Sequence, residues 1–176
     1  MSRNFINPKI FCSLMVNESI VRGIKDAIAV ASTIIGSAER EIAWLVPAPM
    51  LAVGAPYNID EKSKILIQKG GRVRAITAIS STYVETVRQH LDIGEDVRHV
   101  EHYEGVFFLI ADKTQSISAI HINAEELSVD DTVVALWSRD PIYVEYLLSN
   151  FEQAWAQGVD AQERIDELLR AGPSQA

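Results

Sequence analysis

Hydrophobic residues recur along this chain with two periods, one typical of helices and the other of strands. Residues 17–36 carry apolar side chains at helical spacing, with Asn17 as a candidate N-cap and Gly36 as a candidate end. Residues 41–46 form an almost continuously apolar run closed by Pro47, as expected for a strand buried on both faces. The pattern predicts a long first helix followed by a central strand.

Two strand–helix units are predicted next, with glycines where the helices end. In chain order we expect a loop at residues 47–56, a helix from Ile59 to the Gly70-Gly71 pair, a strand at residues 73–79 and a helix that ends at Gly94. Thr82 and Glu85 have the spacing of a capping box, which predicts that the second of these helices begins there.

The second half of the chain begins with consecutive strands. Four apolar or alternating segments, separated by turn residues, lie at residues 97–103, 106–111, 117–123 and 132–137. Asp140 is a candidate N-cap with Pro141 at the first helical position, and the long helix predicted there ends at Gly158. A charged last helix is expected at residues 159–169. This order predicts an α/β fold in which a single mixed sheet is sandwiched by helices.

The chain divides by pattern into three parts. We expect an N-terminal helical segment at residues 1–40, an α/β domain at residues 41–157, and a C-terminal helix and tail at residues 158–176. Apolar positions extend nearly round the first predicted helix and include Val30 and Ile35. Such a helix either lies deep against the sheet or pairs with another chain, and we expect a homodimer.

Composition narrows the function classes. The 176 residues carry a formal charge of −8 with a pI near 5.0, which disfavours nucleic-acid binding by the chain itself. The single cysteine, Cys12, allows no internal disulfide, and together with the lack of a signal-peptide pattern it favours the cytoplasm. No run of 18 uncharged apolar residues occurs, so we expect no membrane association.

Four short phrases in this order resemble the phospholipase D-like superfamily. They lie at residues 69–74, 96–99, 107–112 and 151–155, within a resemblance that spans residues 41–155. Residues 134–139 add a phrase similar to one in the sensor domains of archaeal TrmB-like transcription regulators. The resemblance implies half of a phospholipase D-like fold and, by analogy with those regulators, a role in transcription regulation.

Catalytic members of that superfamily use a His, a Lys two residues later and an Asp five residues after the Lys. The His attacks phosphorus and the Lys neutralises phosphate oxygens. When Asp112 is matched to the family Asp, the His position falls on Gly105 and the Lys position on Phe107. The resemblance therefore implies a degenerate site, a pseudoenzyme without catalytic residues, in which Asp112 is a turn residue between paired strands.

A ligand pocket is predicted instead. An aromatic and histidine group on the predicted strands offers apolar area with a few polar anchors, and arginines at strand ends offer an anion site. The candidate ligand-binding residues are His102, Tyr103, His121, Trp137, Arg74 and Arg98. The alternative for each histidine is a partly exposed surface position or a core position in which its hydrogen bonds are satisfied. The alternative for the arginines, Arg72 included, is that they are solvated or salt-bridged. We expect no metal site and no cofactor, because no local ligand spacing or glycine-rich phosphate loop is present.

These observations favour a non-catalytic regulatory or sensor module that binds a small ligand or a protein partner. One alternative is a divergent phosphodiesterase or nuclease that uses His102 or His121 as nucleophile, with a cation from Arg98 or Arg74. A second alternative is a structural oligomerisation domain whose pocket is filled by its own side chains.

Overall fold

The computed structural model describes residues 17–103, 106–119 and 133–171 of the chain. An eight-stranded mixed sheet runs through this part in the order β1-β7-β6-β5-β2-β3-β4-β8. β2, β3 and β4 are parallel to one another, and every other neighbouring pair is antiparallel. The strands are β1 (Glu18–Arg22), β2 (Glu41–Leu45), β3 (Arg72–Thr77), β4 (Asp96–His99), β5 (Phe107–Ala111), β6 (Gln115–Ala119), β7 (Val134–Ser138) and β8 (Val159–Asp160).

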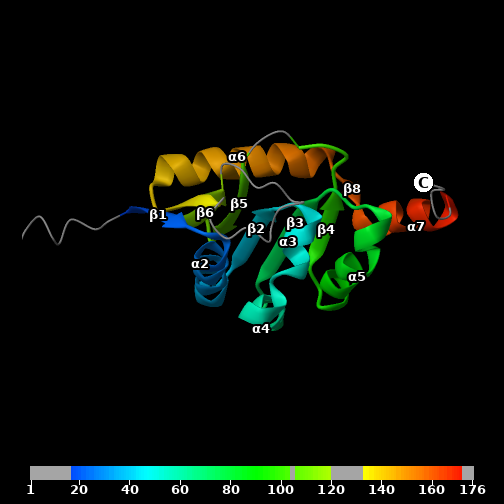
Figure 1. Ribbon diagram of the computed structural model, residues 1–176, viewed down its shortest axis with the longest axis horizontal. Coiled ribbons are helices and arrows are strands. Elements are labelled where there is room, and N and C mark those ends of the chain that lie inside the picture. The colour runs from blue at the N-terminus through cyan, green and yellow to red at the C-terminus, as the bar shows by residue number, and fades with distance from the viewer. Residues whose placement is uncertain (1–16, 104–105, 120–132, 172–176) are drawn as a thin grey trace, which may run out of the picture.

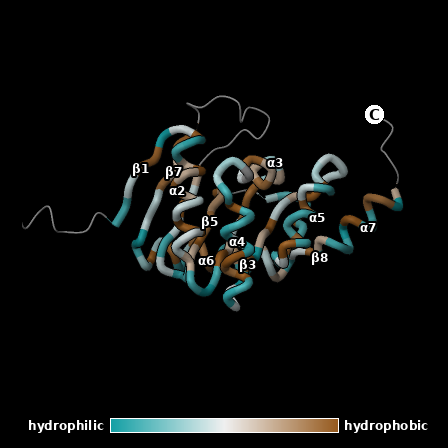
Figure 2. The backbone as a smooth tube through the Cα atoms, turned by 90° about the horizontal axis from the view of Figure 1, so that it is seen from below, coloured by the Kyte–Doolittle hydropathy of each residue, from teal (hydrophilic) through white to brown (hydrophobic). Residues whose placement is uncertain are grey.

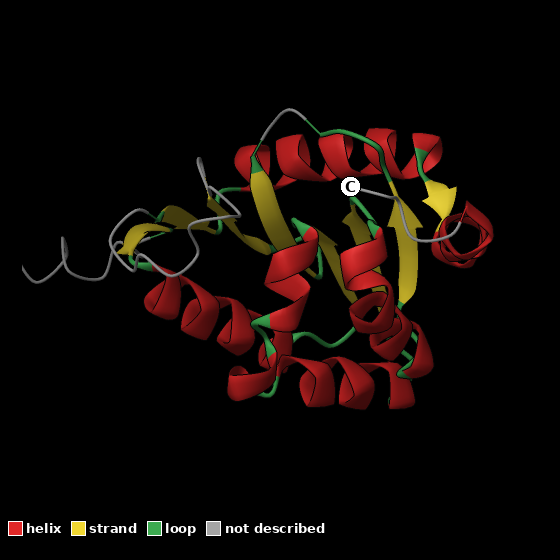
Figure 3. Ribbon diagram, turned by 45° about the vertical axis from the view of Figure 1, so that its right-hand side comes forward, coloured by secondary structure: helices red, strands yellow, loops and turns green. Residues whose placement is uncertain are grey.

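Helices cover both faces of the sheet (Figures 1 and 3). Helix α6 lies along one face, α2, α4 and α5 lie on the other, and α7 lies beside β8 at one end. The helices are α2 (Ile24–Ser37), α3 (Ala48–Ala52), α4 (Ile59–Gln68), α5 (Val84–Asp92), α6 (Pro141–Gln157) and α7 (Ala161–Ala171), with short 3-10 turns at Ala55–Tyr57 and Ser81–Tyr83. The α/β fold predicted from the sequence is confirmed.

Two hydrophobic cores form, one on each face of the sheet. Phe151 and Leu147 of α6 pack on Ile76 and Ile110, while the opposite face is filled by side chains from the other helices, among them Ile35. Figure 2 shows hydrophobic stretches following β3 and β5 through the middle of the molecule. Burial of large aliphatic and aromatic side chains on both faces explains why the central strands read as continuous apolar runs.

The prediction of one helix over residues 17–36 is wrong at its start and accurate to one residue at its end. Glu18–Arg22 form β1, which pairs antiparallel with β7, and α2 starts only at Ile24 after Gly23, whose φ is 87°. Asn17 is therefore no helix cap, and α2 runs past Gly36 to Ser37. Ile20 and Val21 fit a helical period in sequence, but pairing with a distant strand decides their conformation.

Two further local predictions are wrong. The expected loop at residues 47–56 contains α3 and a 3-10 turn, because Pro47 and Pro49 occupy positions where a helix tolerates proline. The expected capping box is not formed, since Ser81–Tyr83 make a 3-10 turn and α5 starts at Val84 without a side-chain cap.

The remaining elements follow the pattern closely. Asp140 caps α6 as predicted, its carboxylate accepting the Tyr143 N–H at 2.9 Å, and Gly70 and Gly94 take positive φ where helices end. β4 stops at His99 instead of residue 103, and β8 replaces the first turn of the predicted last helix. Of the third and fourth segments in the predicted strand run, residues 120–123 and 132 lie outside the described residues.

Candidate functional site

A groove of about 770 Å³ opens beyond the carboxyl end of β4. Its walls come from the segment after β4, from one face of α6, and from β8 and α7. The lining side chains are mostly polar: His99, Val100, Glu101, His102, Tyr103, Asn150, Gln153, Ala154, Gln157, Val159, Arg164 and Glu167. Ligand sites of α/β proteins commonly lie at this end of the parallel strands, and here β4 and the segment after it meet α6, β8 and α7.

His99 is the buried member of the groove wall, with only 4% of the residue exposed. Its Nδ1 accepts the backbone N–H of Ile79 at 2.9 Å, so the neutral ring carries its proton on Nε2. Nε2 has no hydrogen-bond partner in the described part of the chain and lies 3.4 Å from Oε1 of Glu101 in a geometry that forms no hydrogen bond. His99 is thus a fixed donor and no nucleophile.

Arg164 of α7 forms ion pairs with two carboxylates of the groove. The Arg164 guanidinium lies 3.4 Å from Glu101 and 3.3 Å from Glu167. Its Nε is buried and has no hydrogen-bond partner among the described residues. Together with Nε2 of His99, it is one of two buried N–H donors on residues that line the groove and that have no hydrogen-bond partner among the described residues.

Three amides line the α6 wall. Asn150, Gln153 and Gln157 are spaced three and four residues apart and therefore share one helical face. Amides both donate and accept hydrogen bonds without adding charge. The sequence analysis did not identify these amides, because it used only the apolar stripe of this helix. The spacing of the three amides is the signal that could have identified them. Glu101, Arg164 and Glu167 were missed as well.

The structure brings two of the predicted ligand residues into this groove, His102 and Tyr103. Burial, with a smaller contribution from Tyr146, raises the pKa of Tyr103, so its hydroxyl stays protonated at neutral pH. Trp137 lies on β7, with β6, β5, β2 and β3 between it and β4, and its ring packs under Arg139. The predicted grouping of Trp137 with His102 is not formed, and His121 lies outside the described residues.

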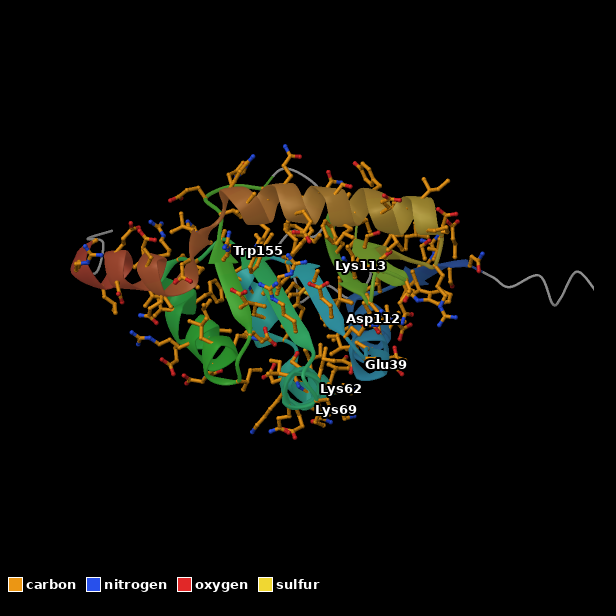
Figure 4. The ribbon with its side chains drawn as sticks, turned by 180° about the vertical axis from the view of Figure 1, so that it is seen from behind. Glu39, Lys62, Lys69, Asp112, Lys113 and Trp155 are labelled. Atoms are coloured by element: carbon orange, nitrogen blue, oxygen red, sulfur yellow. The ribbon has the colours of Figure 1, made fainter. Side chains whose placement is uncertain are left out.

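The three arginines lie together, and two of them are paired with carboxylates. Arg72, Arg74 and Arg98 pack around the ring of Trp155, 5.9, 5.2 and 4.5 Å from its centroid, and Figure 4 shows Trp155 beside the strands. Arg98 donates to the Trp155 carbonyl at 2.6 Å, and Arg72 pairs with Asp96 at 2.6 Å. The salt-bridged alternative describes Arg72 and Arg74, while Arg98 is held by a backbone carbonyl.

Arg74 is the buried centre of that cluster. Its two terminal nitrogens donate to both oxygens of Glu152 at 2.9 and 2.6 Å, and Nε donates to Glu41 at 2.7 Å. Burial works against the charge, yet the hydrogen bonds and charges of the two carboxylates raise the pKa of Arg74 overall. The hydrogen bond from Arg74 in turn lowers the pKa of Glu152. With its donors occupied in this way, Arg74 acts as a structural cation between β3, β2 and α6.

Asp112 occupies a turn after β5 and holds the entrance of β2. Its φ is 50°, and its two oxygens accept the backbone N–H groups of Glu39, Arg40 and Glu41, each at 2.8 Å. Figure 4 shows Asp112 close to Glu39. Partial burial raises its pKa, but the three hydrogen bonds outweigh this and lower it below the ordinary value. Its oxygens are occupied by backbone, so the turn role predicted for Asp112 matches its place in the structure.

Replacing Asp112 with Asn is expected to lower the free energy of unfolding by about 1 to 2 kcal/mol at pH 7, because an amide nitrogen would face a backbone N–H. The pKa of Asp112 is lowered from 3.8, so its contribution is present above that pH and disappears as the pH falls through the folded value. Urea titrations should show the gap from wild type closing in acid, whereas a gap that persists would contradict this account. Asp92→Asn on the exposed end of α5 serves as control.

Neither a metal centre nor a membrane span is found among these elements. In the residues that the structure describes, no three His, Cys, Asp or Glu side chains are grouped so as to hold a metal ion. Within the same ranges, no helix combines the length and apolar character needed to cross a bilayer.

Structural comparison places this architecture beside known proteins. No protein-family model and no curated protein matches the chain in sequence. Its structure is similar to TrmBL2, an archaeal chromatin protein described with a novel mode of DNA binding, with a TM-score of 0.64 and 14% identity over 87% of this chain and 57% of TrmBL2. The chain thus spans little more than half the length of that neighbour.

Two further solved structures match over nearly their whole length. Nuc from Salmonella typhimurium, a phospholipase D family member, has a TM-score of 0.62 and 16% identity over 81% of this chain and 97% of Nuc. NucT from Helicobacter pylori has a TM-score of 0.61 and 14% identity over 81% of this chain and 98% of NucT. The fold implied by the sequence resemblance is confirmed: this chain has a phospholipase D-like fold that resembles TrmB-like proteins.

Proposed function

We propose that this chain is a non-catalytic phospholipase D-like module that binds a small polar ligand in the groove between β4, α6 and α7. The observation that carries the proposal is Nε2 of His99, a buried donor without a hydrogen-bond partner in the described part of the chain, at the groove wall. A buried donor left unsatisfied costs about 1 to 3 kcal/mol, which a ligand oxygen would recover on binding.

The absence of the family's catalytic His and Lys from the matching positions supports the same proposal. The position of the family lysine is Phe107, at the start of β5, and the position of the family histidine is Gly105, which lies outside the described residues. In the arginine cluster, the charges of Arg72 and Arg74 are paired with carboxylates, and Arg98 donates a hydrogen bond to the Trp155 carbonyl. The resemblance to a DNA-binding protein concerns the fold; with a net charge of −8, the chain is proposed not to bind nucleic acid by itself.

A thermal-shift screen against sugars, phosphates and nucleotides tests the groove. We expect at least one compound to raise Tm in a concentration-dependent way, and Gln153→Ala to weaken that compound's binding at least about fivefold. Gln68→Ala, which removes an exposed amide on α4, should leave binding unchanged. A flat response to every compound would contradict the proposal and favour a structural oligomerisation domain.

Hydrolysis of bis(4-nitrophenyl) phosphate separates this proposal from the phosphodiesterase alternative. Wild-type protein should show no turnover above the buffer rate. Turnover that disappears in His102→Ala or His121→Ala would establish a histidine nucleophile and overturn the non-catalytic assignment.

A further inference from the structure

The outer edge of β1 carries no neighbouring strand in the part of the chain that the structure describes. β1 is the terminal strand of the sheet in these ranges. Proline and lysine, which commonly block exposed edges, are absent from β1; its two charged residues, Glu18 and Arg22, carry opposite signs, and its central residue, Ile20, is 63% exposed. Exposed edges that lack such blocking residues are templates for pairing with another strand. Figure 1 shows β1 at the opposite end of the molecule from α7, so this edge is separate from the ligand groove.

The register with β7 fixes which backbone groups of β1 face outward. The Gly23 N–H donates to Val133, and the Asn17 carbonyl accepts from Arg139, so the backbone groups of these two residues point toward the β7 side. Backbone direction alternates along a strand, which places the groups of Ser19 and Val21 on that side as well. The N–H and C=O groups of Glu18, Ile20 and Arg22 therefore point away from the sheet.

This strand is complementary to itself. In an antiparallel pair of two copies centred on Ile20, Ile20 meets Ile20 and Glu18 meets Arg22, and all of these are residues whose backbone groups face outward. Each such pair exchanges two hydrogen bonds, and each end joins opposite charges across the strands. Centring the pair on Glu18 or Arg22 would instead place like charges opposite each other.

We propose that two copies of this chain associate through β1, in antiparallel register about Ile20, to form one continuous sheet across a homodimer. A groove of about 400 Å³ lies beside β1, and its α2 wall carries Ala29 and Val30 together with the polar Asp26 and Thr33. Across the two-fold axis, these α2 faces come together and extend the contact beyond the strands. A five-residue ladder alone buries less than the roughly 1,200 Å² typical of stable interfaces, so the dimer is expected to dissociate at about micromolar concentration.

Sedimentation velocity of the full chain over a concentration series tests the dimer. We expect a monomer–dimer equilibrium, and we expect Ile20→Lys to raise the dissociation constant at least about tenfold by placing two ammonium groups at the centre of the pair. Ile142→Lys removes another exposed hydrophobic residue, 79% exposed on α6, and should leave the equilibrium unchanged. A monomer at every concentration, or equal effects of the two variants, would overturn the proposal.

Charge exchange tests the register. Glu18→Arg and Arg22→Glu should each weaken the dimer severalfold, because each places like charges opposite one another, whereas the double variant should restore wild-type association. Near-ultraviolet circular dichroism and Tm of each variant report whether the fold is intact. Single variants that stay folded and dimerise like wild type would exclude this register, as would failure of the double variant to recover.

Discussion

Arg74→Met is expected to lower the free energy of unfolding by about 3 kcal/mol, the largest loss predicted for this chain. Only 6% of the Arg74 side chain is exposed, and its guanidinium is the shared partner of Glu41 and Glu152 at 2.7 and 2.6 Å. Removing it leaves two neighbouring carboxylates without their cation beside the rings of Phe151 and Trp155. The loss is costly because Glu41, whose side chain is 21% exposed, stays partly desolvated without its cation.

Arg72→Met is the matched control for this measurement. Arg72 lies on the same strand and also contacts a carboxylate, Asp96, but its side chain is 55% exposed. Exposed pairs contribute at most about 1 kcal/mol, so urea unfolding should separate the two variants clearly. The double variant Arg74→Met/Glu152→Gln should lose less than the sum of its single variants, since both changes remove one interaction. An unchanged stability in Arg74→Met together with lost ligand binding would contradict the structural role and make Arg74 a ligand residue.

Glu95→Gln is expected to destabilise the protein by about 2 kcal/mol near pH 6 and by less as the pH rises. The His90 and Glu95 side chains are 3% and 0% exposed, and Nδ1 of the histidine lies 3.0 Å from the carboxylate. Burial alone would lower the pKa of His90, but Glu95, Asp60 and the backbone of Leu51 together raise it above 6.5. The imidazolium is therefore stabilised by its surroundings inside the core.

The sign of the pH dependence follows from the raised pKa. Because His90 binds its proton more tightly in the folded state, its stabilisation is complete below about pH 6.5 and disappears as the pH rises through the folded value. Urea unfolding between pH 5.5 and 9 should show the gap between wild type and Glu95→Gln narrowing. Glu85→Gln, at an exposed position on the same helix as His90, should show no such trend. A gap that widens with pH would contradict the charged pair.

Arg74 with its carboxylates and the His90–Glu95 pair differ from the groove in what their polar groups contact. Arg74 links β3 to β2 and α6, and the His90–Glu95 pair ties α5 to the segment that enters β4. Arg74 is held by both of its carboxylate partners, whereas only one oxygen of Glu95 contacts His90 and its other oxygen has no hydrogen-bond partner among the described residues. Beside the groove, His99 and Arg164 each retain a buried N–H without a hydrogen-bond partner in the same ranges. The groove combines these donors with a volume of about 770 Å³, and this combination is the reason for assigning ligand binding to it and structural roles to the buried pairs.

The sequence by itself determined the fold class and most of the element order. Continuous apolar runs marked the strands buried on both faces, and glycines at Gly70 and Gly94 ended helices because their positive φ suits no other residue well. The order of strand–helix units and consecutive strands then limited the architecture to a mixed sheet with helices on both faces. The replacement of the family His and Lys positions by Gly105 and Phe107 was also readable without coordinates.

Only the tertiary structure decided which polar residues contact one another. Glu18–Arg22 became a strand through pairing with β7, more than a hundred residues away in the chain, which no local period reveals. Arg74 and Glu152 likewise meet across the interface between the sheet and α6, so the charge that resembled an anion site is neutralised within the molecule. The groove takes its side chains from β4 and the segment after it, α6, β8 and α7. Such contacts depend on how the elements pack against one another. The hydrophobic pattern specifies which faces of the elements are buried, but it does not specify which polar side chains meet at the edges of those faces.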